Sequence, residues 1–174
     1  MRRLGWRSRA TGLVLVGMVL AVYAGSAQAT SEPVIRAELE GRPIPAVEVG
    51  RYACHDLDFP LLHCYRSPDE LDAALAARPA RHAGASTLAL AGYVKVFPDR
   101  DLRGNPAVLT VQYDDLSVIG WNDRISSFQG LAGTGGKFFE HIFGSGRTYP
   151  FAAYQIVTYV GDAYNDTFSS VAPG

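Results

Sequence analysis

The chain reads Asn122-Asp123-Arg124-Ile125-Ser126-Ser127 at one point and Asn165-Asp166-Thr167-Phe168-Ser169-Ser170 at another, 43 positions later. Both stretches have the pattern N-D-x-x-S-S. An aromatic residue directly precedes each copy, Trp121 in the first and Tyr164 in the second. A motif of this length that returns once in the same form indicates two copies of one structural unit.

A second pair of features repeats upstream at nearly the same spacing. Phe97 is followed seven positions later by Gly104, and Phe139 is followed seven positions later by Gly146. The two pairs are offset by 42 positions, so they stand in the same frame as the two motif copies. The repeat therefore extends over a whole supersecondary unit of about 40 residues.

From Leu88 onward the sequence favours strands, because short runs of aromatic and β-branched residues recur between turn residues. Two units of four strands predict two Greek keys that pack together as one all-β sandwich, since one unit cannot bury its own face. The strands are expected at 93–97, 108–113, 116–119 and 125–128 in the first unit, and at 137–141, 149–151, 155–160 and 168–171 in the second.

Residues 1–29 have the pattern of a signal peptide. A start with four arginines precedes an apolar run from Leu13 to Ala24, which is short for a membrane span. Ser26-Ala27-Gln28-Ala29 supplies the small-x-small pattern of a cleavage site. We expect cleavage after Ala29 and a secreted, extracellular protein; an uncleaved N-terminal anchor is the alternative.

Charge narrows the classes of partner. Without residues 1–29 the chain keeps 12 basic and 17 acidic residues, a net charge of −5. This balance disfavours nucleic acid and anionic membrane surfaces as partners. The remaining 145 residues suit one domain with an arm: an N-terminal arm at 30–87 and the Greek-key domain at 88–174.

The arm is expected to contain an extended segment at 30–50, a hairpin at 51–65 and a short helix. Ser67-Pro68-Asp69-Glu70 begins the helix, because serine suits the N-cap, proline the first turn and glutamate the capping box. The helix ends before Pro79, and residues 78–87 are expected to be a linker.

The two cysteines, Cys54 and Cys64, both fall in the predicted hairpin, and an even number in an exported chain favours a disulfide between them. Each cysteine adjoins a histidine, His55 or His63. A Cys2His2 zinc site is the alternative, although zinc ligands in such sites are usually spaced two to four residues apart.

The repeated motif is rich in hard oxygen ligands. Asn, Asp and Ser side chains, together with backbone carbonyls, are the groups that calcium prefers. The alternative is that these residues only build turns, which is their commonest role. Two copies in one frame favour metal binding.

From about Leu88 to its end the chain resembles a βγ-crystallin domain of the microbial, calcium-binding kind. The two motif copies and the two aromatic–glycine pairs carry this resemblance, which covers roughly half of the precursor. It implies a wedge of two Greek keys that binds two calcium ions. It also implies that each ion is shared between the motif loop of one key and the first hairpin of the other.

The resemblance implies ligands from the second, third and fifth motif positions and a carbonyl from the residue after the hairpin phenylalanine. The Pro98 site is expected to be weaker, because family members often have an acidic residue there. The candidate metal-binding residues are Pro98, Asn122, Asp123, Arg124, Ser126, Glu140, Asn165, Asp166, Thr167 and Ser169.

We found no catalytic constellation in the sequence. The histidines lack the H-E-x-x-H spacing, and Gly144-Ser145-Gly146 does not fit a nucleophile elbow. The expected function is that of a secreted, non-enzymatic protein whose fold is stabilised by Ca²⁺. One alternative is a peptidase inhibitor: small secreted inhibitors of metalloproteinases share this fold, but they have disulfides inside the crystallin domain. Another is an adhesion module of the cell envelope.

Overall fold

The computed structural model describes residues 33–78, 93–131, 133 and 135–174. The predicted signal peptide and nearly all of the predicted linker lie outside these residues. The elements are β1 (Arg36–Leu39), β2 (Arg42–Ile44), η1 (Ala46–Arg51), β3 (Ala53–Asp58), β4 (Leu61–Tyr65), α1 (Pro68–Ala77), β5 (Val94–Phe97), η2 (Arg100–Leu102), β6 (Ala107–Leu109), η3 (Leu116–Ile119), β7 (Ser127–Gly130), β8 (Gly136–His141), β9 (Ser145–Phe151), β10 (Ile156–Val157) and β11 (Ser170–Pro173), where η marks a 3-10 helix.

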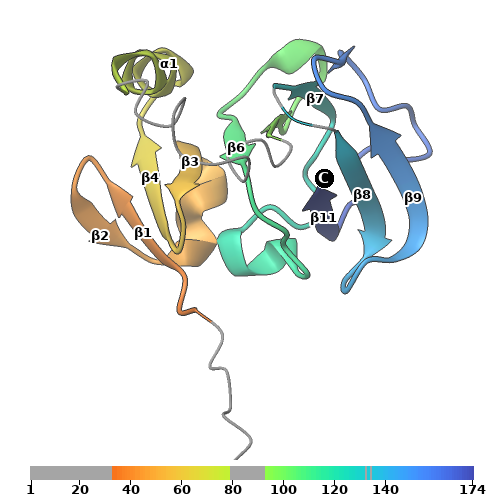
Figure 1. Cartoon of the computed structure of the whole chain (residues 1–174), viewed down its shortest axis with the longest axis horizontal. Helices are drawn as coiled ribbons and strands as arrows, with labels where there is room; N and C mark the ends of the chain where they lie inside the picture. Colours follow the sequence, from red (N-terminus) through yellow and green to blue (C-terminus); the bar gives the residue numbers. More distant parts are fainter. Residues whose placement is uncertain (1–32, 79–92, 132, 134) are drawn as a thin grey trace, which may run out of the picture. The chain divides into compact units, whose positions relative to one another are not determined.

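The chain forms two Greek keys, key one at 93–130 and key two at 135–174. Each key contributes one strand position to the sheet that is otherwise built by the other key. In the larger sheet, β6, β5 and β7 of key one are followed by β10 of key two. In the smaller sheet, β9, β8 and β11 of key two lie side by side, and Tyr113 of key one bridges to Val171 of β11 (Figure 1). The predicted pair of Greek keys is confirmed.

Aromatic side chains fill the core that both keys share. Phe138 of key two lies with its ring centroid 5.2 Å from that of Phe128 in key one, 4.9 Å from Phe151 and 5.0 Å from Phe168. Phe128, Phe138 and Phe168 have no exposed surface. Because such rings bury large apolar areas and add favourable ring contacts, neither key has a complete core without the other.

One predicted strand is wrong. Residues 116–119, expected as the third strand of key one, form the 3-10 helix η3. The Asp115 carboxylate accepts a 2.8 Å hydrogen bond from the Ser117 N–H at the start of this helix, and Gly120 ends it in the left-handed conformation. These end signals prevail over the strand preference of the residues between them. The strand that key one exchanges is reduced to the bridge at Tyr113.

The other predicted strands are present, and several have different ends. The strand predicted at 125–128 is β7, two residues later, and the one at 168–171 is β11, also two residues later. The strand predicted at 155–160 is only the two residues of β10, and the one at 108–113 ends at Leu109. The strands at 93–97, 137–141 and 149–151 correspond to β5, β8 and β9.

The arm extends the larger sheet of the Greek keys. The segment at 30–50, expected to be extended, contains β1, β2 and most of the 3-10 helix η1 in its described part. β3 pairs in parallel with β6, and β4, β1 and β2 follow, so the sheet has eight strands in the order β10-β7-β5-β6-β3-β4-β1-β2. The sheet is thus continuous from the arm into key one, a pairing that the sequence did not indicate.

The hairpin and the helix of the arm form where the sequence predicts them. β3 and β4 are antiparallel, with Cys54 opposite Cys64. The Glu70 N–H donates to Ser67 Oγ at 3.3 Å, and the Glu70 carboxylate accepts from the Arg66 N–H at 2.9 Å. Leu71 is fully buried on the helix face that contacts Ala53 of β3.

Cys54 and Cys64 form the predicted disulfide, and both are almost completely buried in the main core cluster. The Cys2His2 zinc alternative is wrong, because the two sulfurs bond to each other. His55 and His63 are moreover on the opposite face of the hairpin, since successive side chains in a strand alternate in direction.

Replacing both cysteines by alanine should lower the free energy of unfolding by about 2–3 kcal/mol, because the disulfide closes a 10-residue loop in the unfolded chain. Since the sheet and the core are continuous, urea unfolding of the variant should remain one transition by fluorescence and circular dichroism. A separate early transition would contradict this.

Candidate metal centre

The two motif loops have the same unusual backbone conformation. The second residue of each, Asp123 or Asp166, is left-handed, with φ of 54° and 55°. Asp and Asn reach this region more easily than other residues with a side chain. In both loops the preceding Asn122 or Asn165 donates its amide to the aspartate carboxylate at 2.7 Å. The repeated Asn-Asp pair therefore adopts the same local structure in both loops.

The fifth residue of each motif anchors the loop to the first strand of its own key. The Ser126 N–H donates to the Phe97 carbonyl at 3.0 Å, and the Ser169 N–H donates to the Phe139 carbonyl at 2.9 Å. These bonds bring the fifth-position serines beside the residues that follow the two phenylalanines, Pro98 and Glu140.

The second residue of each motif binds the loop of the other key. The Asp123 N–H donates to the Phe168 carbonyl at 3.0 Å, and the Asp166 N–H donates to the Ile125 carbonyl at 3.4 Å. The two loops thus cross, and Asp166 Oδ1 lies 3.3 Å from Ser126 Oγ, the fifth-position hydroxyl of the opposite copy.

In the first candidate site, oxygens of three kinds meet. Ser126 Oγ lies 2.8 Å from the Pro98 carbonyl oxygen and 3.3 Å from Asp166 Oδ1. Pro98 and Ser126 come from key one and Asp166 from key two. The structure therefore places the key one hairpin with the key two loop, as the resemblance implies, and adds the serine of key one to that group. Thr167 follows Asp166, and its hydroxyl bonds to the Tyr164 carbonyl at 2.9 Å.

The second candidate site has Glu140, Ser169, Asp123 and Arg124 at the equivalent positions. The Glu140 carboxylate is held by the Arg147 guanidinium at 2.9 and 2.7 Å, and these hydrogen bonds lower the pKa of Glu140 to about 2. Arg147 also donates to the Ala163 carbonyl at 2.9 Å. Proline stands where this site has glutamate, so the two sites differ in charge around a similar backbone.

The glycine of each aromatic–glycine pair is required by the hairpin that presents these carbonyls. Gly104 and Gly146 are left-handed, with φ of 82° and 80°. A Cβ on Gly104 would lie 2.6 Å from Pro98 Cγ, and one on Gly146 would lie 2.8 Å from His141 Cδ2. Glycine thus keeps each hairpin folded closely over the residue beside the site.

The sixth-position serines have a structural role that the sequence analysis did not separate from metal binding. Each donates its hydroxyl to a carbonyl of its own hairpin and accepts a backbone N–H from the same hairpin. Ser127 donates to Asp99 at 2.5 Å and accepts from Leu102 at 3.1 Å, and Ser170 donates to His141 at 2.6 Å and accepts from Gly144 at 3.1 Å. The signal in the sequence for this structural role was the repetition of the second serine in both motif copies.

The remaining candidates are the first-position asparagines and Arg124. Asn165 Oδ1 is buried and has no hydrogen-bond partner among the described residues, so it is an oxygen that a cation could use. Arg124 Nη1 lies 3.4 Å from the Gly120 carbonyl, and its guanidinium lies 5.8 Å from the centre of the Trp121 ring. Because the guanidinium of Arg124 is held by these contacts, its backbone carbonyl is the group that it can offer to the site.

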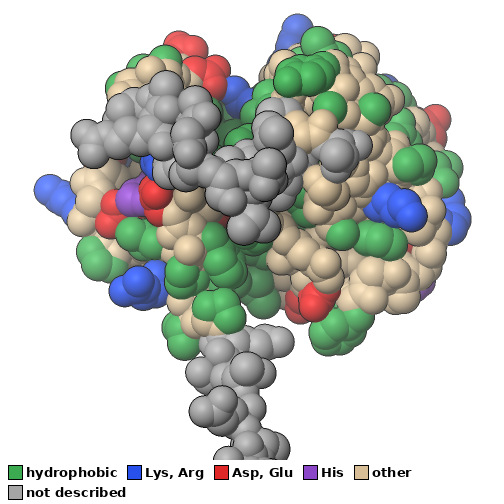
Figure 2. All heavy atoms as spheres, viewed as in Figure 1, with side chains coloured by type: hydrophobic (Ala, Val, Ile, Leu, Met, Phe, Trp, Pro, Cys, Tyr) green, Lys and Arg blue, Asp and Glu red, His purple; other side chains and the backbone are tan. Residues whose placement is uncertain are grey.

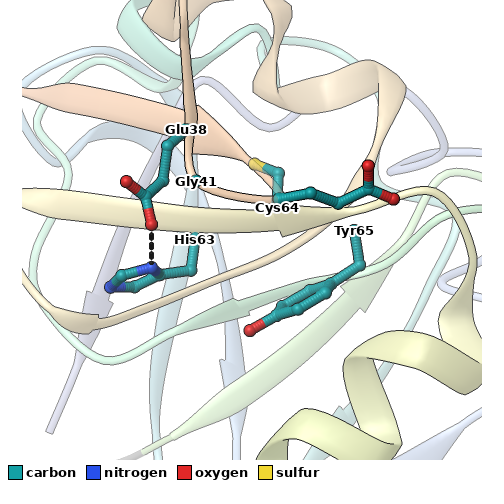
Figure 3. A pocket seen from close by; sticks show the side chains of 6 residues that line it. Glu38, Gly41, His63, Cys64 and Tyr65 are labelled. Carbon is teal, nitrogen blue, oxygen red and sulfur yellow. Dashed lines mark hydrogen bonds and ion pairs between the residues drawn. The ribbon is translucent and has the colours of Figure 1, made fainter.

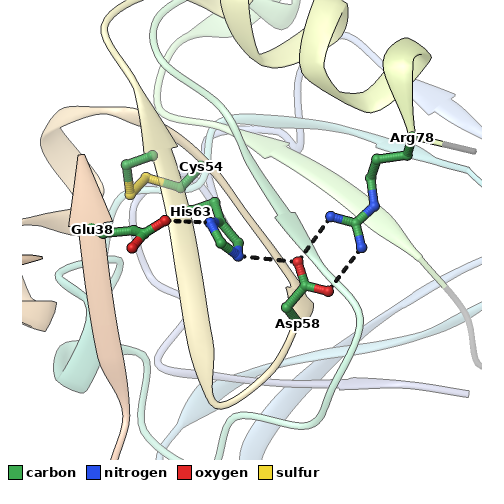
Figure 4. Close-up of polar contacts among 6 residues, drawn as sticks. Glu38, Cys54, Asp58, His63 and Arg78 are labelled. Carbon is green, nitrogen blue, oxygen red and sulfur yellow. Dashed lines mark hydrogen bonds and ion pairs between the residues drawn. A yellow bond between two sulfur atoms is a disulfide. The ribbon is translucent and has the colours of Figure 1, made fainter. Parts of the chain in front are cut away.

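A separate polar cluster lies in the arm. His63 Nδ1 is 2.7 Å from Glu38 Oε1, and Nε2 is 3.0 Å from Asp58 Oδ2; Arg78 makes two 2.8 Å hydrogen bonds to the same Asp58 (Figure 4). The Arg78 hydrogen bonds lower the pKa of Asp58 to about 2. Both ring nitrogens of His63 thus face a carboxylate, and Asp58 links the ring to Arg78.

Beside this polar cluster is a cavity of about 240 Å³ lined by Glu38, His63 and Tyr65 among others (Figure 3). His55, opposite His63, is buried, and burial lowers its pKa to about 4. Two of the residues that line the cavity, Glu38 and His63, are already paired with each other, and Glu40 is paired with Arg66. The cluster fastens β1, β3, β4 and the end of α1 together.

Within the described ranges, no three His, Cys, Asp or Glu side chains are grouped so as to hold a metal ion. The candidate centre instead combines one carboxylate with carbonyl and hydroxyl oxygens, which is chemistry suited to a hard cation. Charged side chains of both signs are interspersed on the face seen in Figure 2. No helix in the described part of the chain is long and apolar enough to cross a membrane.

Solved structures similar to this chain are βγ-crystallin domains, the family that the doubled motif predicts. A βγ-crystallin from Ciona intestinalis is 25% identical, with a TM-score of 0.44, over 47% of this chain and 99% of that one. An archaeal βγ-crystallin is 22% identical, with a TM-score of 0.43, over 48% and 99%. A domain from Clostridium beijerinckii is 22% identical, with a TM-score of 0.41, over 46% and 94%. No protein-family model matches the chain, and no curated protein matches it.

Replacing Ser127 or Ser170 by alanine should destabilise the metal-free protein by about 1–3 kcal/mol each, because a part-buried N–H and a carbonyl lose the hydroxyl of a buried serine. Denaturant unfolding in the presence of a chelator measures this. Ser145→Ala, an exposed serine with one local hydrogen bond, is the matched control and should change stability by less than about 0.5 kcal/mol. Equal effects of all three substitutions would contradict the assigned role.

Proposed function

We propose that this protein, whose fold is a pair of βγ-crystallin-type Greek keys, is an exported, non-enzymatic calcium-binding module in which two ions stabilise the fold. The first ion is assigned to Pro98, Ser126, Asp166 and Thr167. The second is assigned to Glu140, Ser169, Asp123 and Arg124. Asn122 and Asn165 orient the two aspartates.

The observation that carries the proposal is the convergence at Ser126. The Ser126 hydroxyl oxygen lies 2.8 Å from the Pro98 carbonyl oxygen and 3.3 Å from a carboxylate oxygen of Asp166, and the three residues come from three separate segments. Oxygens that share one calcium ion at about 2.4 Å are typically about 3 Å apart. Asn165, whose amide bonds to Asp166, has a buried Oδ1 without a partner in the described residues, and this supports a cation near Asp166.

The charge of the sites supports modest affinity. Each site has one aspartate, and the carboxylate of Glu140 in the second site is already paired with Arg147. Few carboxylates and several neutral oxygens are typical of extracellular calcium modules, with dissociation constants on the order of 10⁻⁴ M. Among the similar solved structures, a double mutant of the clostridial protein with two introduced histidines is a nickel complex.

Export and the absence of catalysis are proposed from the sequence. The pattern of residues 1–29 supports export, and the motifs of common enzymes fail to match. Metalloproteinase inhibition and envelope adhesion stay alternatives; the disulfide at Cys54–Cys64 lies in the arm rather than inside the Greek keys. Measuring the activity of a panel of secreted metalloproteinases with and without the protein tests the inhibitor alternative.

Isothermal titration with calcium should give close to two sites per chain. At ten times the dissociation constant, each site should add about 1.4 kcal/mol to the free energy of unfolding, because only the folded state binds. Ser126→Ala combined with Ser169→Ala should remove most of this gain, and Ser145→Ala should leave it unchanged. The absence of heat and of a thermal shift at millimolar calcium would reject calcium binding. A full shift in the double variant would reject only the ligand assignment.

A further inference from the structure

We propose that the arm positions the second calcium site selectively, with Asp56 of β3 as the positioning residue. This inference rests on the proposed function, because it concerns the affinity of one of its two sites. It predicts a role for residues outside the region that resembles the crystallins. Segment 110–124 leads from the arm to the second site.

Asp56 attaches the start of this segment to the arm. It is fully buried, and the Thr110 backbone N–H donates to its two carboxylate oxygens at 2.8 and 3.0 Å. The Tyr113 hydroxyl donates to the same carboxylate at 3.1 Å. Burial raises the pKa of the Tyr113 hydroxyl, so it remains a donor. A buried carboxylate needs all of its donors, so the position of Asp56 fixes that of residues 110–113.

The same segment holds the loop that carries Ser169. Tyr113 and Val171 exchange backbone hydrogen bonds at 2.9 and 3.0 Å. Leu116 then donates its N–H to the Ser169 carbonyl at 2.8 Å. Ser169 belongs to the second site. Asp56 is therefore connected to this site by one short run of hydrogen-bonded backbone.

A second contact reaches the other side of the site. The arm helix η1 packs against η3, and a Cβ on Gly50 would lie only 2.2 Å from the Gly120 carbonyl oxygen. The same Cβ would lie 2.7 Å from Arg124 Nη1. Arg124 is the third residue of the first motif and follows Asp123, so the arm abuts the loop that completes the second site.

The hydrogen bonds of Ser126 and Asp166 in the first site are all made to residues of the keys. Ser126 is bonded to Phe97 and Pro98, and Asp166 to Ile125 and Asn165. The arm also contacts key one through Asp72, which pairs with Lys95 of β5, but this contact is made by an exposed carboxylate on α1. Asp72 thus offers a matched control: the same residue type, in the same arm, on a different part of key one.

The test measures each site separately in the full-length protein. Calcium titration of Ser126→Ala reports the second site, and titration of Ser169→Ala reports the first. Adding Asp56→Asn should weaken the second site at least about fivefold, a typical coupling between sites, and change the first by less than about twofold. Asp72→Asn should change neither. A general loss of stability would weaken both sites alike, so the ratio between sites distinguishes positioning from destabilisation.

Tyr113→Phe is the second variant, because Asp56→Asn could prevent folding. It removes only the hydroxyl that binds Asp56 and should weaken the second site in the same selective way. Equal loss at both sites, or no loss at the second site in a folded variant, overturns the inference. If the unsubstituted protein gives no calcium signal, the proposed function fails first, and that result is separate.

Discussion

The crossing of the two motif loops is the constraint on which the rest of the structure depends. Asp123 and Asp166 each donate a backbone N–H to a carbonyl of the opposite copy. Both aspartates are left-handed in this arrangement, and each loop supplies the hydrogen-bond acceptor of the other. Neither key has a complete core, and each contributes one strand position to the sheet of the other. A single key is therefore not expected to fold stably or to bring the two loops together. The crossed arrangement therefore needs both copies of the repeat.

The arm adds a second constraint, because it buries a carboxylate between itself and key one. Burial raises the pKa of Asp56, opposed by hydrogen bonds from Thr110 and Tyr113. A carboxylate in such a place costs free energy unless its partners are in position, so it does not add stability as an apolar residue would. Its effect is to make one arrangement of segment 110–113 much better than the alternatives. The parallel pairing of β3 with β6 brings Asp56 to this place.

Features that repeat or that depend on adjacent residues could be predicted from the sequence. The two keys, the β3–β4 hairpin with its disulfide and the helix begun by Ser67 all have local signals. The third strand of key one could not be predicted from residue preference, because Asp115 and Gly120 supply end signals for η3. The partners of Asp56 lie 54 and 57 positions away, and no periodic pattern links them. The grouping of Ser126 with Asp166 likewise depends on the crossing of loops rather than on spacing.

The two candidate sites show how a repeated backbone can carry different chemistry. Pro98 and Glu140 occupy equivalent positions, and each follows the phenylalanine that anchors a motif serine. Proline contributes only its carbonyl, whereas the Glu140 carboxylate is taken up by Arg147, whose charge opposes a nearby cation. The backbone of segment 110–124 further connects the second site to the arm. Symmetry of the fold therefore does not make the sites equal, because side chains and the arm act on them separately.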